Sequence, residues 1–191
     1  MAVQPGHYRL GPDRGRLIWR TFRDGLAATV GHDLTIEVSR WSGELTVGDE
    51  LAPTSLELRI ELGSMTVLTG TGGVKPLTDR DRREIAVTAR KVLGADHHPQ
   101  ALFTADSFQP ESGGGWLASG SLTINGQTRP VRVRAAKTAE GRYRATATVV
   151  QSQFGIKPYT AFLGALRVRD AVEVEAEADL PEPDNGRGAQ S

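Results

Sequence analysis

The sequence contains no cysteine, no excess of one charge and no long hydrophobic run. Without cysteine, disulfides, thiol catalysis and thiolate zinc sites are all excluded. The 23 basic and 23 acidic side chains balance, so no overall field favours binding to nucleic acid. Because no apolar stretch has the length of a signal peptide or a membrane-spanning helix, we expect a cytoplasmic protein.

What the sequence does contain is alternation, seen most clearly in residues 116–134, WLASGSLTINGQTRPVRVR. Leu122 and Ile124 alternate with polar residues, which is typical of a strand with one apolar face. Asn125 and Gly126 separate this run from a second one, and both residue types tolerate the positive φ of a type I′ turn. The segment therefore predicts a β-hairpin and an antiparallel β protein.

Similar patterns recur along most of the chain. The further strands that they predict lie at 7–10, 16–22, 27–47, 55–62, 101–108, 142–151 and 168–180. The apolar parity of 27–47 changes after Arg40, which predicts a bulge or bend between Ser39 and Gly43. The length suits one domain, so we expect a single β domain over 1–180 and a disordered tail at 181–191.

One helix is predicted, at about 79–93, after a long glycine-rich connection at 63–76. Thr78 is a suitable N-cap, with Asp81 as its capping-box partner. Apolar residues recur at helical spacing through the segment, and Gly94 follows it in the manner of a helix C-terminus.

About eight antiparallel strands predict a barrel whose interior is either filled or just wide enough for one small ligand. Several residues of the inward parity are small. They are Ala135, Ala145, Ala147, Ala176 and Ala178. Such an interior needs a filler, and the sequence leaves two open. One is the helix or the apolar segment 154–162, and the other is an apolar ligand.

Several short motifs, taken together, resemble the YceI-like family of lipid-binding, lipocalin-like β-barrels. They are GHYRL at 6–10 with Asp13, VGHD at 30–33, WSG at 41–43, HPQALF at 98–103, GSLTING at 120–126, RPV at 129–131 and FGI at 154–156. No single motif is specific, but their order and spacing together are. The resemblance implies an extended eight-stranded antiparallel barrel, with one helix, whose lumen holds a long amphiphile.

The amphiphile that the resemblance implies is a polyisoprenoid, an isoprenoid quinone-like molecule or a fatty-acid derivative. The leading hypothesis is therefore a non-catalytic carrier or store without cofactor or metal. The predicted helix has a basic-leaning face that is either solvated or a surface for transient membrane contact, and a homodimer also stays open. The basic residues of this helix are Arg80, Arg82, Arg83, Arg90 and Lys91, diluted by Asp79, Asp81 and Glu84. We expect the lumen to be lined by Trp19, Val30, His32, Leu58, Ile60, Phe103, Leu122, Val133 and Phe154.

Two other functions remain open from the sequence. His32 lies on the apolar parity of its predicted strand, where it would meet a ligand, act as a general acid or base beside a carboxylate, or be satisfied within the core. An enzyme of this kind would need His32 and a carboxylate within hydrogen-bond reach, but the sequence shows no convincing nucleophile or full triad. A barrel filled by its own side chains would instead be an interaction module.

Two other segments carry chemistry-bearing residues without a supporting pattern. Asp96, His97 and His98 are consecutive, so in an extended segment they point apart, and no third metal ligand stands at a known spacing. The loop at 70–76 contains glycines and a lysine but does not match a phosphate-binding motif. We expect it to be a connector or a loop at the mouth of the lumen.

Overall fold

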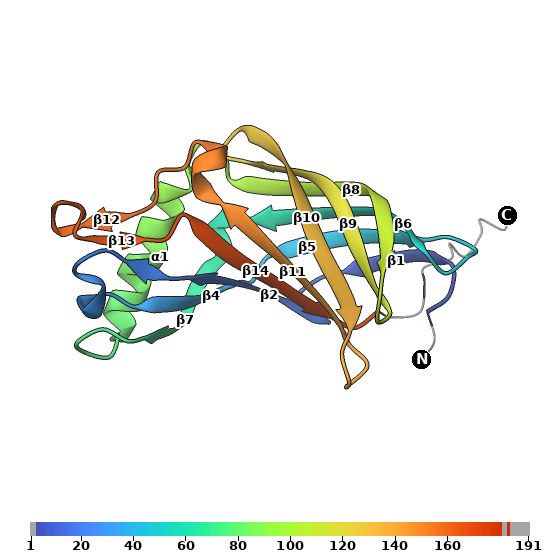
Figure 1. Cartoon of the computed structure of the whole chain (residues 1–191), viewed down its shortest axis with the longest axis horizontal. Helices are drawn as coiled ribbons and strands as arrows, with labels where there is room; N and C mark the ends of the chain where they lie inside the picture. Colours follow the sequence, from blue (N-terminus) through green and yellow to red (C-terminus); the bar gives the residue numbers. More distant parts are fainter. Residues whose placement is uncertain (1–2, 181–182, 184–191) are drawn as a thin grey trace, which may run out of the picture.

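The computed structural model describes residues 3–180 and 183. An antiparallel sheet curls around the long axis of the molecule, with one α-helix across it (Figure 1). The strands of this sheet are β1 (Gly6–Leu10), β2 (Gly15–Thr21), β4 (Asp33–Val38), β5 (Trp41–Val47), β6 (Pro53–Glu61), β7 (Met65–Thr71), β8 (Gln100–Glu111), β9 (Gly115–Ile124), β10 (Gln127–Lys137), β11 (Tyr143–Val150) and β14 (Ala171–Ala178). A small second sheet consists of β3 (Arg23–Asp24), β12 (Thr160–Ala161) and β13 (Leu166–Val168). The helices are α1 (Asp79–Val92) and four 3-10 turns, η1 (Ala28–Val30), η2 (Leu62–Ser64), η3 (Gln151–Phe154) and η4 (Phe162–Gly164).

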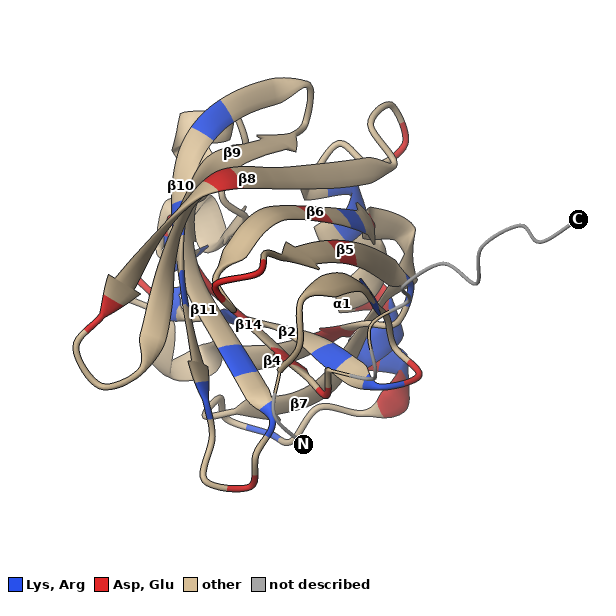
Figure 2. Ribbon diagram, turned by 90° about the vertical axis from the view of Figure 1, so that its right-hand side faces the viewer, with Lys and Arg blue, Asp and Glu red and all other residues tan. Residues whose placement is uncertain are grey.

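The large sheet has the strand order β1-β5-β6-β8-β9-β10-β11-β14-β2-β4-β7. Its two ends are formed by the same three chain segments, since β1 continues into β2, β4 into β5 and β6 into β7. The eleven strands therefore correspond to eight chain segments, three of which are bent. This confirms the predicted antiparallel, lipocalin-like architecture and explains why the strand count is higher than expected. Figure 2 looks along the curled sheet from the β1 end, with α1 at the far end.

The predicted bend between Ser39 and Gly43 is present. β4 ends at Val38 and β5 begins at Trp41, and both of these residues are buried. The backbone between them is held by hydrogen bonds to the neighbouring bent segment, from the Ser39 N–H to the Ser64 carbonyl at 3.1 Å and from the Arg40 N–H to the Ser64 hydroxyl at 3.0 Å. The change of apolar parity after Arg40 thus marks the bend, through which the apolar side chains stay on the inward face.

The hairpin and the helix are confirmed close to their predicted bounds. Asn125 and Gly126 have φ values of 52° and 69°, as a type I′ turn between β9 and β10 requires. α1 begins with a complete capping box, in which Thr78 accepts from the Asp81 N–H and the Asp81 carboxylate accepts from the Thr78 N–H.

Two predictions about local structure are wrong. Residues 28–30 form the turn η1 instead of a strand, because the Ala27 N–H donates to the Ala165 carbonyl of a distant segment at 2.9 Å and the ladder begins only at Asp33. The connection expected at 63–76 contains the strand β7, which pairs with β4. The tail at 181–191 lies outside the described residues apart from Pro183.

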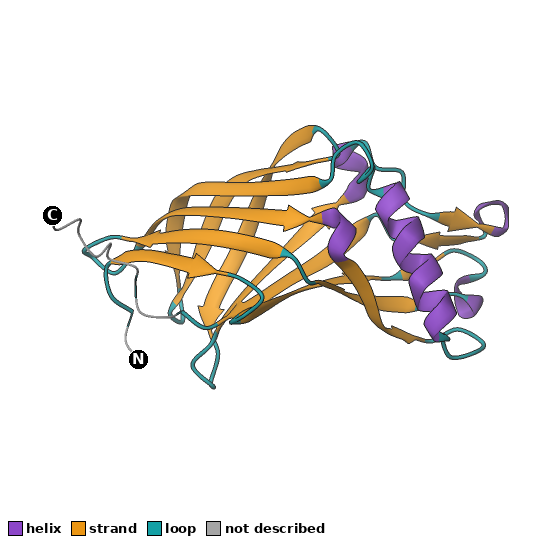
Figure 3. Ribbon diagram, turned by 180° about the vertical axis from the view of Figure 1, so that it is seen from behind, coloured by secondary structure: helices purple, strands orange, loops and turns teal. Residues whose placement is uncertain are grey.

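The helix packs over the interior at one end of the curled sheet (Figure 3). Ile85, Ala89 and Val92 on α1, with Leu93 directly after it, contact the buried cluster that the inward faces of the strands form. Among the described residues, no helix combines the length and the hydropathy needed to cross a bilayer.

Candidate functional site

The interior of the curled sheet is filled at the end that α1 covers. Phe154, at the end of η3, is fully buried there with Leu62 and Ile156. The inward-facing Gly120 leaves room for a large side chain, since a Cβ at this position would approach the Phe103 Cζ to 2.8 Å. Helix, η3 and aromatic side chains thus provide the protein's own filler in this part.

Elsewhere the interior is covered only partly. Three alanines lie in one row across neighbouring strands, since Ala145 on β11 is paired with Ala135 on β10 and with Ala176 on β14. Directly paired residues share a face of the sheet, and Ala176 packs against the core cluster. All three are only partly buried, as are Ala147, Val149 and Val174 beside them. Apolar residues on the inward face therefore retain accessible surface around the alanine row.

Seven of the nine predicted lining residues lie in or against the interior cluster. Trp19, Ile60, Phe103, Leu122 and Phe154 are buried members, and Leu58 and Val133 are partly buried and pack against them. Most of these residues lie on strands, where the alternation of inward and outward side chains places them on the same face. Phe154 instead lies in η3. Leu58 and Val133 contact the cluster and are only partly buried, as are the three alanines of the row.

The structure places the other two predicted lining residues differently. Val30 lies in η1, is 41% exposed and is absent from the interior cluster. His32 precedes β4, and its Nε2 lies 2.8 Å from the Lys75 carbonyl oxygen. Because both residues precede the start of the strand at Asp33, the parity argument that placed them inward does not apply. His32 instead connects two loops.

An opening in the wall adjoins the alanine row. β10 and β11 pair only from Arg134 to Lys137 on β10, while β11 pairs with β14 along its whole length. Where the two strands diverge, there is a groove of about 460 Å³. Its lining includes inward-facing Val131 and Val174 as well as Arg132 from the outward face. The groove thus draws residues from both faces of the sheet, and sequence reasoning missed it because single strands do not reveal where a ladder ends.

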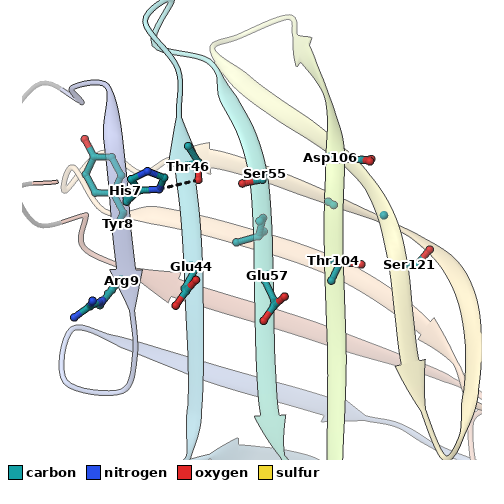
Figure 4. Close-up of a pocket in the computed structure, with 13 residues that line it drawn as sticks. His7, Tyr8, Arg9, Glu44, Thr46, Ser55, Glu57, Thr104, Asp106 and Ser121 are labelled. Carbon is teal, nitrogen blue, oxygen red and sulfur yellow. Dashed lines mark hydrogen bonds between the residues drawn. The ribbon is translucent and has the colours of Figure 1, made fainter. Parts of the chain in front are cut away.

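A second groove, of about 720 Å³, lies over the strands from β1 to β9 and is lined mainly by polar side chains. Figure 4 shows these side chains, with the His7 ring directed toward Thr46. The His7 Nδ1 lies 3.1 Å from the Thr46 hydroxyl. Glu44, Glu57 and Asp106 also line it, but no group of three or more His, Asp or Glu side chains is arranged to hold a metal among the described residues.

The buried interior cluster consists of apolar residues, and the glutamates of β14 lie on the opposite face of the sheet. Glu177 on β14 is buried and is paired with Arg16 at 2.9 Å and with Arg142 at 3.7 Å. Glu175 pairs with Arg20 at 3.3 Å. In the buried cluster, the indole Nε1 atoms of Trp19 and Trp41 are enclosed and have no hydrogen-bond partner among the described residues. The interior is thus suited to an uncharged apolar chain.

Comparisons with known proteins agree with this architecture. A family model described as YceI-like domain matches residues 8–180. A UPF0312 protein of Shewanella baltica is 26% identical over 126 residues, and one of Shewanella putrefaciens is 25% identical over the same length. Each alignment covers 61% of this chain and 61% of the relative, so the similarity extends over less than two thirds of these proteins.

Two solved structures share the fold over most of their length. BcnA of Burkholderia cenocepacia aligns with a TM-score of 0.62 at 16% identity, covering 88% of this chain and 97% of that chain. A polyisoprenoid binding domain from Saccharophagus degradans, implicated in plant cell wall breakdown, aligns with a TM-score of 0.57 at 12% identity, covering 94% and 100%. At these identities the likeness concerns the fold alone.

Proposed function

This chain belongs to the YceI-like family, and on that basis we propose that it binds a long-chain amphiphilic lipid inside its curled sheet. The ligand class is a polyisoprenoid or an isoprenoid quinone-like molecule, held without chemical change by a carrier or store. The binding domain in this proposal comprises residues 1–180. The polyisoprenoid binding domain with the same fold supports the ligand class.

The observation that carries the proposal is the partly exposed apolar surface around Ala135, Ala145 and Ala176. Residues of this type, on the inward face of a sheet, are normally covered by other side chains. The part of the interior next to α1 is covered in this way, whereas the part around the alanine row is not. An apolar chain of the ligand would complete the packing there.

The burial of apolar surface favours such a complex. Burying about 300 Å² of lipid tail at roughly 25 cal/mol per Å² contributes about 7 kcal/mol before the entropy cost of immobilising the tail. The buried cluster of the described interior is apolar, which favours a neutral chain in the lumen with its polar end elsewhere. The opening between β10 and β11 is the route that we propose for entry.

The alternative of an enzyme with His32 as general acid or base has less support. The hydrogen-bond partner of the imidazole is the backbone carbonyl of Lys75, whereas the mechanism requires a carboxylate and a substrate pocket within reach of the ring. The nearby Asp81 carboxylate is engaged by the Thr78 hydroxyl and N–H in the helix cap.

Native mass spectrometry of the gently purified protein, followed by organic extraction, tests the proposal. We expect a discrete adduct with the mass of an isoprenoid or another long-chain lipid. A bare protein that also fails to take up added prenols, isoprenoid quinones and fatty acids would refute lipid binding and favour a barrel that serves as an interaction module.

A further inference from the structure

Three loops project beyond α1 at the end of the molecule opposite β1 (Figures 1 and 3). They are residues 25–30, 72–75 and 162–164, which we call the tip loops. Each displays a large apolar side chain to solvent: Leu26 and Leu163 are fully exposed, and Val74 and Phe162 are 74% and 65% exposed. Apolar residues gathered at one exposed site commonly mark a binding surface.

In the tip loop at 162–164, two apolar residues have an unfavourable backbone conformation. Phe162 and Leu163 have φ values of 50° and 54°. Side chains without a polar group of their own rarely adopt this left-handed region, where asparagine and glycine are preferred. Two bulky apolar residues thus occupy positions where asparagine or glycine would adopt the same backbone more easily.

Hydrogen bonds made by the tip loops and by the residues that flank them hold the three loops together. The Ala27 N–H donates to the Ala165 carbonyl at 2.9 Å, which connects the first loop to the third. The His32 ring bonds the Lys75 carbonyl at 2.8 Å. The Arg23 guanidinium donates to the Gly31 carbonyl at 2.9 Å and to the Thr71 carbonyl at 3.5 Å, and so bridges the first and second loops. The tip loops are therefore presented together.

We propose that the tip loops dock the protein on the surface of a lipid bilayer. The inference rests on the proposed function, because a lipid carrier must take its ligand from a membrane or deliver it there. The chemistry along the third loop agrees with this occupant: Phe162 and Leu163 stand at the tip, and Tyr159 and Arg169 follow behind it. Arg167 also lies there, paired with Asp24 at 3.1 Å. Apolar residues in front of an aromatic hydroxyl and cations match the order of regions in a membrane interface.

A bilayer also suits the shape of the surface better than a folded partner does. The apolar side chains stand on three separate narrow loops, and a fluid interface can close around each of them, whereas a protein partner would need a matching hollow for each. The chain that lines the opening between β10 and β11 through Phe154 runs on through 155–159 into the third loop. Docking at the tip loops would thus bring the proposed entry route toward the membrane.

The test compares two matched variants, Leu163→Asn and Leu51→Asn. Leu51 is also exposed and has a φ of 60°, but it lies in the β5–β6 turn at the opposite end of the molecule. Asparagine tolerates the left-handed region, so neither variant is expected to lose its fold. The readout is flotation with vesicles of equal parts phosphatidylcholine and phosphatidylglycerol, together with native mass spectrometry of bound lipid.

We expect the wild type and Leu51→Asn to float with the vesicles, and Leu163→Asn to partition about tenfold less, the effect of removing one buried leucine. Wild type that does not bind vesicles, or equal binding by both variants, would overturn the proposal. Self-association that Leu163→Asn abolishes, without vesicle binding, would assign the tip loops to contact between copies instead. Because native mass spectrometry follows retained lipid separately, loss of docking and failure of the carrier function are distinguishable.

Discussion

Ala145 on β11 lies directly opposite Ala176 on β14, and Ala135 on β10 lies on its other side. This row crosses three neighbouring strands with the smallest side chain that a strand normally carries. It leaves the inward face partly exposed at the level where Leu17 of β2 and Trp116 of β9 continue the row. The proposed ligand site depends on this relationship more than on any single predicted residue.

Enlarging a residue of the alanine row should displace the ligand. In Ala145→Phe, the ring would occupy the space that we assign to the lipid tail, so we expect the lipid adduct to be lost while the fold is kept. The matched control is Thr66→Phe, which places the same ring on the exposed outward face of β7, outside the groove between β10 and β11. Native mass spectrometry measures the adduct. Equal lipid retention in both variants would remove the alanine row from the site.

A charge at Leu58 should also weaken lipid retention. Leu58 packs against the interior cluster but is only partly buried, so Leu58→Asp is expected to leave the barrel folded. A desolvated carboxylate beside an apolar tail is unfavourable, and we expect at least a tenfold loss of bound lipid. Glu44→Gln, on the outward face of the neighbouring strand, serves as the control for changes in charge. Unchanged lipid content in folded Leu58→Asp would show that Leu58 does not line the site.

His32 should act as a connection between loops and not on a ligand. In His32→Ala, the bond to the Lys75 carbonyl is lost, so amide hydrogen exchange should accelerate in residues 72–75 while lipid retention stays unchanged. The expected loss of stability is about 1 kcal/mol or less, as for one exposed hydrogen bond. His7→Ala removes a histidine hydrogen bond in the polar groove at the β1 end and is the control. Loss of bound lipid in His32→Ala alone would return His32 to the ligand site.

Acid should weaken the start of α1. The hydrogen bonds from the Thr78 hydroxyl and the Thr78 N–H lower the pKa of the Asp81 carboxyl. A carboxyl whose pKa is lowered by folding contributes stability above its unfolded pKa and loses it as the pH falls through the folded pKa. NMR titration should therefore give Asp81 a pKa below that of a free aspartate. In Asp81→Asn, helix protection should no longer fall over this acidic range, and a pH dependence equal to that of the wild type would contradict the assignment.

Gly120 should be required for close packing between strands. A Cβ at this position would overlap the Thr104 carbonyl oxygen and press on the Phe103 ring. We expect Gly120→Ala to lower the free energy of unfolding by about 2 kcal/mol. Gly63→Ala is the matched control, since its Cβ would meet only the flexible Arg90 side chain at 3.7 Å. Equal stability of the two variants, measured by chemical denaturation, would show that the strands adjust to the added methyl group.

Much of the fold was predictable because it follows from local sequence patterns. Alternation located the strands, the asparagine–glycine pair located the β9–β10 turn, and the change of parity after Arg40 located the bend between β4 and β5. The capping residues located α1. The same alternation identified the alanines and most of the interior cluster, since residues of one parity face the same side of a sheet whatever the strands' order.

The sequence by itself determined which residues share the inward face, and thereby the apolar character of the interior. Only the tertiary structure decided where that face is filled, where β10 parts from β11, and that 28–32 leave the strand to join other loops. Val30 and His32 follow the right parity, but the partners that hold their segment, Ala165 and Lys75, are far away in the chain. Periodicity reports on neighbours in sequence, whereas these contacts depend on which distant backbone groups meet in the folded chain.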